Sequence, residues 1–173
     1  MVAPQTKEAR PSIRPVDFGG VRGYNFGVAK TKMDRQQMLK ATAENELLQF
    51  LGIKIETAEP DRVVLSMEVT PKVHQYVGIM NGGISLFLSE TAASMGAVIG
   101  ADLTKVSPVG VEINANHLRS VSRGVIRAEA TPVYTGKTMA VWSVEITNDK
   151  GKLVCISRCT LLLKKGPAAA AET

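Results

Sequence analysis

Residues 83–100 form a long segment, GISLFLSETAASMGAVIG, in which Glu90 is the only ionisable side chain. Because apolar residues lie on almost every side of a helix with this sequence, the pattern predicts a helix that is buried on most sides. Such a helix must be covered by other elements, which limits the folds open to the chain. Burying Glu90 is costly unless the carboxylate is paired or used in chemistry. We therefore expect a functional acid; a structural carboxylate bonded to Thr91 or Ser94 is the alternative.

Four β-rich runs follow this segment and can supply the covering layer. They are VGVEINANHLRS (109–120), GVIRAEATPVYTG (124–136), TMAVWSVEITND (138–149) and KLVCISRCTLLLK (152–164). Short turn sequences separate these runs, which favours an antiparallel meander, and strands of this length are long enough to curl. The sequence thus predicts an α+β domain in which a curved antiparallel sheet wraps around the long central helix.

Two elements are expected ahead of the central helix. Residues 34–52 predict one helix, with Asp34 as its N-cap and Gly52 at its end. Residues 62–70 alternate between apolar and polar side chains, which predicts a half-buried strand.

The chain has the length of one domain, which we assign to residues 33–164. Residues 1–32 predict a flexible N-terminal arm, and residues 165–173 a disordered C-terminal tail. No window reaches the roughly 20 apolar residues of a membrane span, so we expect no membrane association. Nothing resembles a signal peptide, so a cytoplasmic location is expected.

Charge and cysteine patterns point to no macromolecular or metal partner. The net charge of +5, from 21 basic and 16 acidic residues, is compatible with an anionic ligand or with plain surface charge. No run of Lys and Arg interleaved with aromatic residues indicates a nucleic-acid site. Cys155 and Cys159 lie about 13 Å apart on a predicted strand, too far for a disulfide. No metal-ligand spacing occurs, so we expect neither a metal nor a cofactor.

Gly82 and Gly83 open the central helix. The first backbone N–H groups of a helix have no internal partner and carry the positive end of its dipole, so they attract a negatively charged oxygen. Glycine also allows a ligand to approach the backbone closely. The alternative is that the two glycines only form a tight turn into the helix.

Glu90 follows Gly83 by seven residues, so the two are separated by about 10.5 Å along the helix axis. One helix therefore cannot bring both to a single carbonyl carbon. Two antiparallel copies of the helix about a two-fold axis can pair Glu90 of one chain with Gly83 of the other. This predicts a homodimer with two shared sites.

Three segments resemble a known family. They are QYVGIMNGGISLFLSETAAS, VGVEINANHLRS and GKTMAVWSVEITNDKGKLVCISRCT, which together span about residues 46–163. They are similar to the hotdog-fold acyl-CoA thioesterases of the 4-hydroxybenzoyl-CoA and 1,4-dihydroxy-2-naphthoyl-CoA, PaaI-like type. The resemblance implies a hotdog fold and a dimer, commonly a dimer of dimers.

The resemblance also implies roles for individual residues. Glu90 resembles the catalytic carboxylate, and Gly83 the backbone donor that polarises the thioester carbonyl. Gln75 resembles a side chain near the carbonyl or the attacking water. Ser94, one turn after Glu90, resembles the hydroxyl that holds that water or the carboxylate.

The resemblance assigns Gly82 and four residues of the second segment, His117, Leu118, Arg119 and Ser120, to substrate and coenzyme A binding. The guanidinium of Arg119 suits a phosphate group. The alternative is that His117 and Arg119 are solvent-facing residues on one face of a strand.

Asn81 departs from the family, which usually has a histidine before the two glycines. Asparagine can donate a hydrogen bond but cannot take up a proton near neutral pH. Asn81 is therefore either a site residue or only the N-cap of the helix.

The resulting hypothesis is an acyl-CoA thioesterase that releases a free acid, aryl or arylacetyl by preference, and coenzyme A. Two alternatives stay open at this point. One is a non-catalytic acyl-CoA-binding or sensing hotdog protein, and the other is an acyl-CoA hydratase or dehydratase. Glu90 as general base or as nucleophile is equally open.

Overall fold

The computed structural model describes residues 35–165 of the 173-residue chain. The predicted N-terminal arm (1–32) and the predicted N-cap Asp34 lie outside the described residues. The predicted tail does too, except for Lys165, which ends the last strand.

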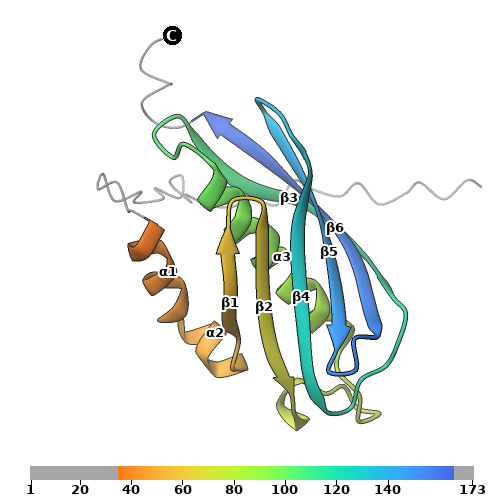
Figure 1. Ribbon diagram of the computed structural model, residues 1–173. Coiled ribbons are helices and arrows are strands. Elements are labelled where there is room, and N and C mark those ends of the chain that lie inside the picture. Colours follow the sequence, from red (N-terminus) through yellow and green to blue (C-terminus); the bar gives the residue numbers. More distant parts are fainter. Residues whose placement is uncertain (1–34, 166–173) are drawn as a thin grey trace, which may run out of the picture. The chain divides into compact units, whose positions relative to one another are not determined.

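Three α-helices and six strands make up the described part of the chain (Figure 1). The helices are α1 (Arg35–Ala43), α2 (Glu46–Leu51) and α3 (Gly82–Gly100), and a short 3-10 turn spans Pro71–Val73. The strands are β1 (Lys54–Glu59), β2 (Arg62–Val69), β3 (Val106–His117), β4 (Gly124–Thr135), β5 (Met139–Asn148) and β6 (Leu153–Lys165). All six belong to one antiparallel sheet with the order β1-β2-β4-β5-β6-β3.

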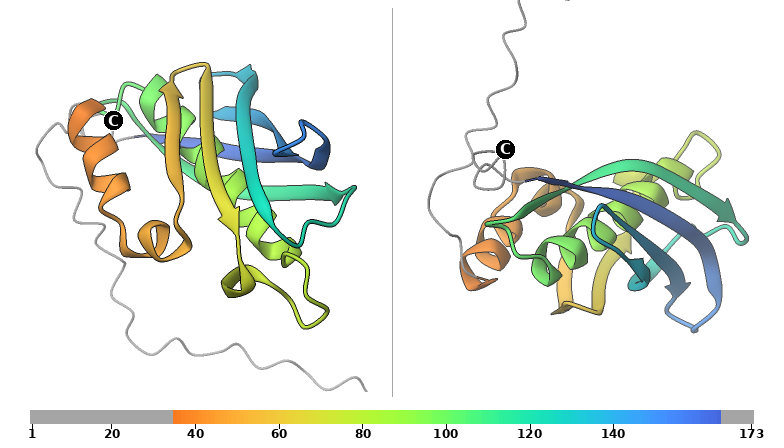
Figure 2. Two further views of the ribbon diagram at one scale, coloured as in Figure 1. Left: turned by 60° about the horizontal axis from the view of Figure 1, so that its bottom comes forward. Right: turned by 90° about the horizontal axis from the view of Figure 1, so that it is seen from above.

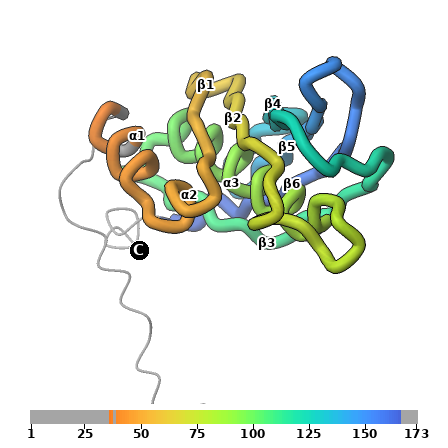
Figure 3. The backbone as a smooth tube through the Cα atoms, turned by 90° about the horizontal axis from the view of Figure 1, so that it is seen from below, coloured from red at the N-terminus to blue at the C-terminus, as the bar shows by residue number. Residues whose placement is uncertain are grey.

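The sheet curves around α3, which lies along its concave face (Figures 2 and 3). Leu88, Ala92 and Ala93 of α3 have no exposed surface, and neither have Ile126 and Val144 of the sheet. Small side chains on this side of α3 let the helix approach the strands closely, as tight core packing requires. The predicted architecture, a curved antiparallel sheet around a central helix, is confirmed.

The predicted meander holds for only three of the four runs. β4, β5 and β6 are consecutive neighbours, but β3 pairs with β6 at the far edge of the sheet. β4 already has β2 and β5 as neighbours. Turn chemistry gives the length of a connection, but it does not decide which strand occupies the place beside β4.

The single helix predicted for residues 34–52 is wrong, because two helices occupy this segment. Asn45 has extended backbone dihedrals (φ −65°, ψ 124°), and its side chain accepts hydrogen bonds from the N–H groups of Leu47 and Leu48. Asn45 therefore interrupts the helix and caps a new one. The predicted end at Gly52 is confirmed, since Gly52 adopts the left-handed conformation (φ 70°).

β2 is buried on both faces rather than half-buried as predicted. Val64 and Ser66 of its outer face are only 5% and 4% exposed. They pair across the sheet with Glu129 and Arg127, whose long side chains form ion pairs with neighbouring residues. Side chains of this length cover apolar surface with their stems. The sequence did not predict β1, which pairs with β2 on the side opposite β4.

The expectation that no segment has the length and composition of a membrane span is wrong. Among the described residues, α3 is long and apolar enough to cross a membrane by length and composition alone. In this fold 44% of that window is buried. Packing inside the curved sheet is sufficient reason for its apolar composition.

Gly96 provides a test of how tightly α3 fits the sheet. A Cβ at this position would overlap the ring of Trp142, which is 2% exposed. Helix propensity alone would make Gly96→Ala more stable by roughly 1 kcal/mol. Overpacking a closed core instead costs about 1–3 kcal/mol, so we expect a net loss of stability in urea unfolding.

Gly100→Ala is the matched control in the same helix. Its Cβ would lie 3.4 Å from the nearest atom, the carbonyl oxygen of Pro60, which is ordinary contact. It should leave the free energy of unfolding unchanged or raise it. A Gly96→Ala protein as stable as Gly100→Ala would contradict the close fit.

Candidate active site

Glu90 lies beside the edge strand β3, where a Cβ at Gly110 would lie 2.8 Å from its Oε1. The prediction that its carboxylate is buried is wrong for the single chain, where the side chain is exposed. Within residues 35–165 it makes no hydrogen bond or ion pair, and Thr91 donates its hydroxyl to the Phe87 carbonyl instead (2.7 Å). A structural carboxylate bonded to Thr91 is therefore not what the fold contains.

A cavity of about 580 Å³, here called the acid pocket, opens beside Glu90 between α3 and the α1–α2 segment. Its α3 residues recur at helical spacing and form one stripe: Phe87, Glu90, Thr91, Ser94, Met95, Val98 and Ile99. The facing wall comes from α1, α2 and the residues around them: Leu39, Ala41, Thr42, Asn45 and Leu48.

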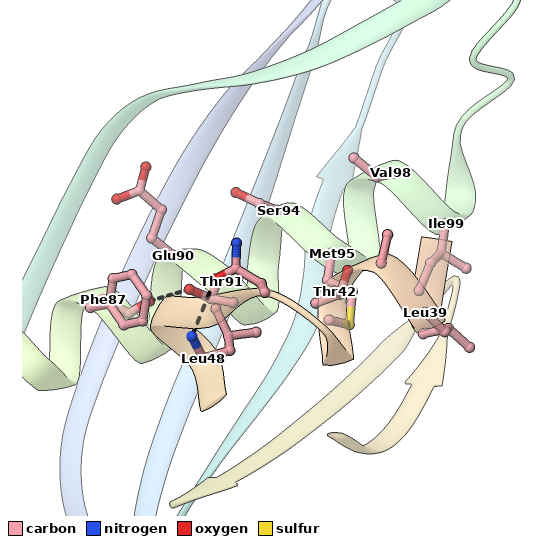
Figure 4. Close-up of a pocket in the computed structure, with 12 residues that line it drawn as sticks. Leu39, Thr42, Leu48, Phe87, Glu90, Thr91, Ser94, Met95, Val98 and Ile99 are labelled. Atoms are coloured by element: carbon pink, nitrogen blue, oxygen red, sulfur yellow. Dashed lines mark hydrogen bonds between the residues drawn. The ribbon is translucent and has the colours of Figure 1, made fainter. Parts of the chain in front are cut away.

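Figure 4 shows how the stripe is arranged in the acid pocket. Glu90 and Ser94 project from the same side of α3, one turn apart, while Leu39 lies near Ile99 at the other end. The carboxylate of Glu90 and the hydroxyl of Ser94 thus lie toward the end of the cavity away from Leu39 and Ile99. The α1–α2 wall was not predicted, because helical spacing in residues 34–52 identifies a helix but not the surface that it faces.

The start of α3 is capped by Asn81. Its Oδ1 accepts a hydrogen bond from the N–H of Gly83 at 2.8 Å, and the Asn81 carbonyl accepts from Ile84. Asn81 is therefore an N-cap, as one of the two hypotheses stated. Within the described residues the N–H of Gly82 has no acceptor, so Gly82 rather than Gly83 offers a free donor here.

A second cavity of about 380 Å³, here called the glycine pocket, adjoins Gly82. It brings together six of the residues assigned by resemblance: Gln75, Gly82, His117, Leu118, Arg119 and Ser120. The remaining lining residues were not predicted: Ile79, Met80, Ser85, Val121 and Val154. Most of these are apolar residues on loops or strand ends, and no local pattern distinguishes them from core.

His117 and Gly82 are in close contact in this pocket. A Cβ at Gly82 would lie 2.9 Å from Nε2 of His117, so the imidazole occupies the space that a side chain would need. Contact with His117 is therefore a second structural reason for glycine at position 82, besides the tight turn into the helix. It also brings an imidazole next to the free N–H of the helix start.

Gln75 sits in a loop held by main-chain and side-chain bonds. Its N–H donates to the Ile79 carbonyl at 2.8 Å, and Nε2 of His74 lies 2.9 Å from the Ser122 carbonyl. Gly78 turns the loop with a positive φ of 80°. These contacts fix the loop from which Gln75 lines the glycine pocket.

The two pockets divide the predicted site residues between them, except that Gly83 and Asn81 line neither pocket. Glu90 and Ser94 line the acid pocket, whereas Gln75 and Gly82 line the glycine pocket. Eight residues of helix separate Gly82 from Glu90, which is about 12 Å along the axis. One chain therefore contains two halves of the predicted site at different points of α3.

No group of three His, Cys, Asp or Glu side chains in the described part of the chain could hold a metal ion. Cys155 and Cys159 are both buried and free. Burial raises the pKa of Cys159 to about 11, and the negative charges of Glu90 and Glu112 contribute to the rise. Neither thiol is therefore available as a thiolate near neutral pH.

Comparison with known proteins identifies the class. The profile of the thioesterase superfamily matches residues 77–155. A 1,4-dihydroxy-2-naphthoyl-CoA hydrolase from Listeria monocytogenes is 44% identical over 119 residues, which are 69% of this chain and 96% of that protein. A protein of the same name from Escherichia coli is 37% identical over 126 residues, 72% of this chain and 90% of the relative.

Solved structures agree with the sequence relatives. The crystal structure of a thioesterase from Haemophilus influenzae is 34% identical and matches with a TM-score of 0.70, covering 79% of this chain and 94% of that one. A mutant thioesterase from Pseudomonas aeruginosa matches with the same score, at 33% identity and 79% and 97% coverage. The chain therefore belongs to the thioesterase superfamily and has its hotdog fold. The expected class of activity, acyl-CoA thioester hydrolysis, is confirmed.

The cap at Asn81 generates a prediction about stability. Asn81→Ala removes the acceptor for the Gly83 N–H and should lower the free energy of unfolding by about 1 kcal/mol. Asn81→Ser keeps a capping oxygen and should cost much less. Urea unfolding of both variants measures this, and equal stability of the alanine and wild-type proteins would show that the cap is unimportant.

Proposed function

We propose that this thioesterase hydrolyses aryl- or arylacetyl-CoA, using Glu90 of one chain and the start of α3 of a second chain. The observation that carries the proposal is the position of Glu90. It is a carboxylate at the polar end of a cavity that is otherwise lined mainly by apolar side chains. A carboxylate in such a place can act on a carbonyl whose acyl group fills the apolar end.

The reaction follows from the groups available. Water adds to the thioester carbonyl carbon, the carbonyl oxygen becomes negatively charged, and the C–S bond then breaks to release coenzyme A as the thiolate. Glu90 either removes a proton from that water or attacks the carbonyl itself to form an anhydride that water hydrolyses. Ser94, one turn further along α3, is within the same pocket to orient the water or the carboxylate.

The free N–H of Gly82 fits the developing oxyanion. The resemblance assigned this role to Gly83, but the Gly83 N–H already donates to Asn81. A donor at a helix N-terminus has the added advantage of the helix dipole. We therefore move the assignment by one residue, and we assign to Asn81 the task of fixing the backbone around that donor.

The glycine pocket fits the coenzyme A portion of the substrate. His117 and Arg119 give it hydrogen-bond donors, Arg119 gives it positive charge, and Leu118 and Val121 give it apolar surface. An arginine fork suits phosphate oxygens, and apolar surface suits the pantetheine arm. This assignment supports the roles given to residues 117–120 by resemblance.

The second chain is needed because the two pockets cannot share one carbonyl. Its docking is supported by β3, which has no neighbouring strand on its outer edge among residues 35–165. That edge carries the exposed side chains of Val109 and Val111. Long unprotected edge strands pair readily with another strand. A dimer of dimers stays a prediction from the resemblance.

The acyl group is assigned from the cavity and from the relatives. The acid pocket, with Met95, Ile99 and Leu39 at its apolar end, has the volume of an ordinary small-molecule site. Two relatives are named 1,4-dihydroxy-2-naphthoyl-CoA hydrolases, which supports an aromatic acid.

Replacement of the acid tests the mechanism. Glu90→Gln should keep the fold and lower turnover by about 10²- to 10⁴-fold, the usual loss for a catalytic acid–base group. Release of thiol from benzoyl-, phenylacetyl- and fatty acyl-CoA measures both turnover and acyl preference. The control is Glu145→Gln on β5, because Glu145 is an exposed carboxylate that lines neither pocket and does not lie on the β3 edge. Normal turnover by Glu90→Gln would refute the role of Glu90.

Mixing inactive chains tests the shared site. Glu90→Gln chains mixed with Gln75→Ala chains should recover about a quarter of wild-type turnover, because about half of the dimers are hybrids with one intact site in two. Glu90→Gln mixed with Ser94→Ala is the control, since both changes affect the same pocket and no hybrid site is intact. Equal turnover from both mixtures would exclude a site built from two chains.

A further inference from the structure

Gly110 lies within β3, where glycine has no evident use. Glycine inside a strand weakens it, because the residue loses more backbone entropy on folding and contributes no side chain. Its backbone dihedrals do not explain it, since the glycines with positive φ are Gly52, Gly78, Gly124 and Gly151. Alanine could adopt the same backbone conformation. The remaining reason for glycine at a strand position is a close approach by another group.

That group is the carboxylate of Glu90. A Cβ at Gly110 would lie 2.8 Å from Oε1 of Glu90 and 3.8 Å from its Cδ, and apart from its chain neighbours no other atom of residues 35–165 comes within 4 Å. Gly110 pairs with Leu161 of β6, whose side chain is 1% exposed. The two residues therefore share the face of the sheet that is turned toward α3, and the missing side chain leaves room for Glu90 on that face.

A β-bulge follows Gly110 directly. The pairing of β3 with β6 shifts between Gly110 and Glu112, so that Val111 is the extra residue. Because side chains alternate along a strand, the extra residue turns Glu112 to the opposite face from Gly110. There Glu112 accepts hydrogen bonds from Asn114 (2.8 Å) and Thr160 (3.4 Å). Only one carboxylate thus lies on the α3 side at this point.

Nothing else restrains Glu90 in the described part of the chain. Its side chain is exposed and forms no hydrogen bond or ion pair within residues 35–165. A free glutamate samples many rotamers, whereas a catalytic carboxylate must be held within about 0.5 Å of its working position. The adjacent surface of β3 therefore has a larger effect on the position of the Glu90 carboxylate than it would if hydrogen bonds held that carboxylate.

We propose that Gly110 is a positioning residue for Glu90: the absence of a side chain on β3 lets the carboxylate lie against the strand and so sets the direction in which it points. The bulge at Val111 keeps Glu112 out of the same space. This inference rests on the proposed catalytic role of Glu90, and it adds a residue from the edge strand to the site.

The decisive variant is Gly110→Ala. The new methyl group would meet the far end of a flexible, exposed side chain, so Glu90 can rotate away at little cost and the melting temperature should not fall. A misplacement of about 1 Å can reduce turnover by about 10²-fold. We expect kcat to fall by about 10- to 10²-fold while KM changes little, because coenzyme A binds in the other pocket. A crystal structure of the variant should show the carboxylate displaced from β3.

Two comparisons separate positioning from general damage. Gly100→Ala is the matched glycine control, since Gly100 lines neither pocket and its Cβ would meet Pro60 at ordinary contact distance, and it should keep wild-type kcat. Glu90→Asp should be combined with Gly110→Ala, because the shorter side chain no longer reaches the methyl group. If the residues act together, the double variant loses much less than the product of the two single losses.

The results distinguish this inference from the function on which it rests. If Glu90→Gln abolishes turnover but Gly110→Ala retains the wild-type kcat, the positioning role is excluded while the thioesterase mechanism stands. Strictly multiplicative losses, or a kcat loss that follows a fall in melting temperature, also overturn it. If Glu90→Gln itself retains turnover, the proposed catalytic role fails first.

Discussion

The packing of α3 into the concave face of the sheet is the interaction on which the other features depend. Fully buried Leu88, Ala92 and Ala93 bring the helix close to the strands, and Gly96 makes room for Trp142. Because the core uses only one side of α3, the opposite stripe is available for a pocket. The same packing that stabilises the domain thus determines which helix positions can carry chemistry.

The rigid length of α3 separates the two halves of the proposed site. A helix rises by about 1.5 Å per residue, so groups eight residues apart on it cannot meet at one atom. The free N–H at Gly82 and the carboxylate at Glu90 are fixed at separate points, each with its own cavity. A shared site between two chains is the simplest way in which this fold can combine them. The asparagine before the glycines fits the same scheme, since it stabilises the helix start without needing to carry charge.

The edge strand β3 has more than one use in this arrangement. Its first half approaches Glu90 through Gly110, and its last residue, His117, contacts Gly82. One strand therefore touches both halves of the site while its outer edge has no partner strand within the described residues. A change in its pairing with β6 would move Gly110 and His117 together relative to α3, so the surroundings of Glu90 and Gly82 depend on the register of the sheet.

The sequence by itself determined the features that depend on neighbouring residues. The apolar run at 83–100 predicted α3, the glycine pair predicted its start, and the lone acid within it identified Glu90. Alternating and β-rich runs identified five of the six strands. Helical spacing failed only at Asn45, where a side chain that caps a new helix overrode the pattern of residues 34–52.

Only the tertiary structure decided which elements meet. It moved β3 from the expected place beside β4 to the far edge, revealed β1, and left the Glu90 side chain exposed to solvent. It also brought Gly110 against Glu90, a contact between residues twenty positions apart that no local period reports. Periodicity and turn chemistry act over a few residues, whereas strand order, and therefore the surroundings of the acid, is set by long-range pairing and packing.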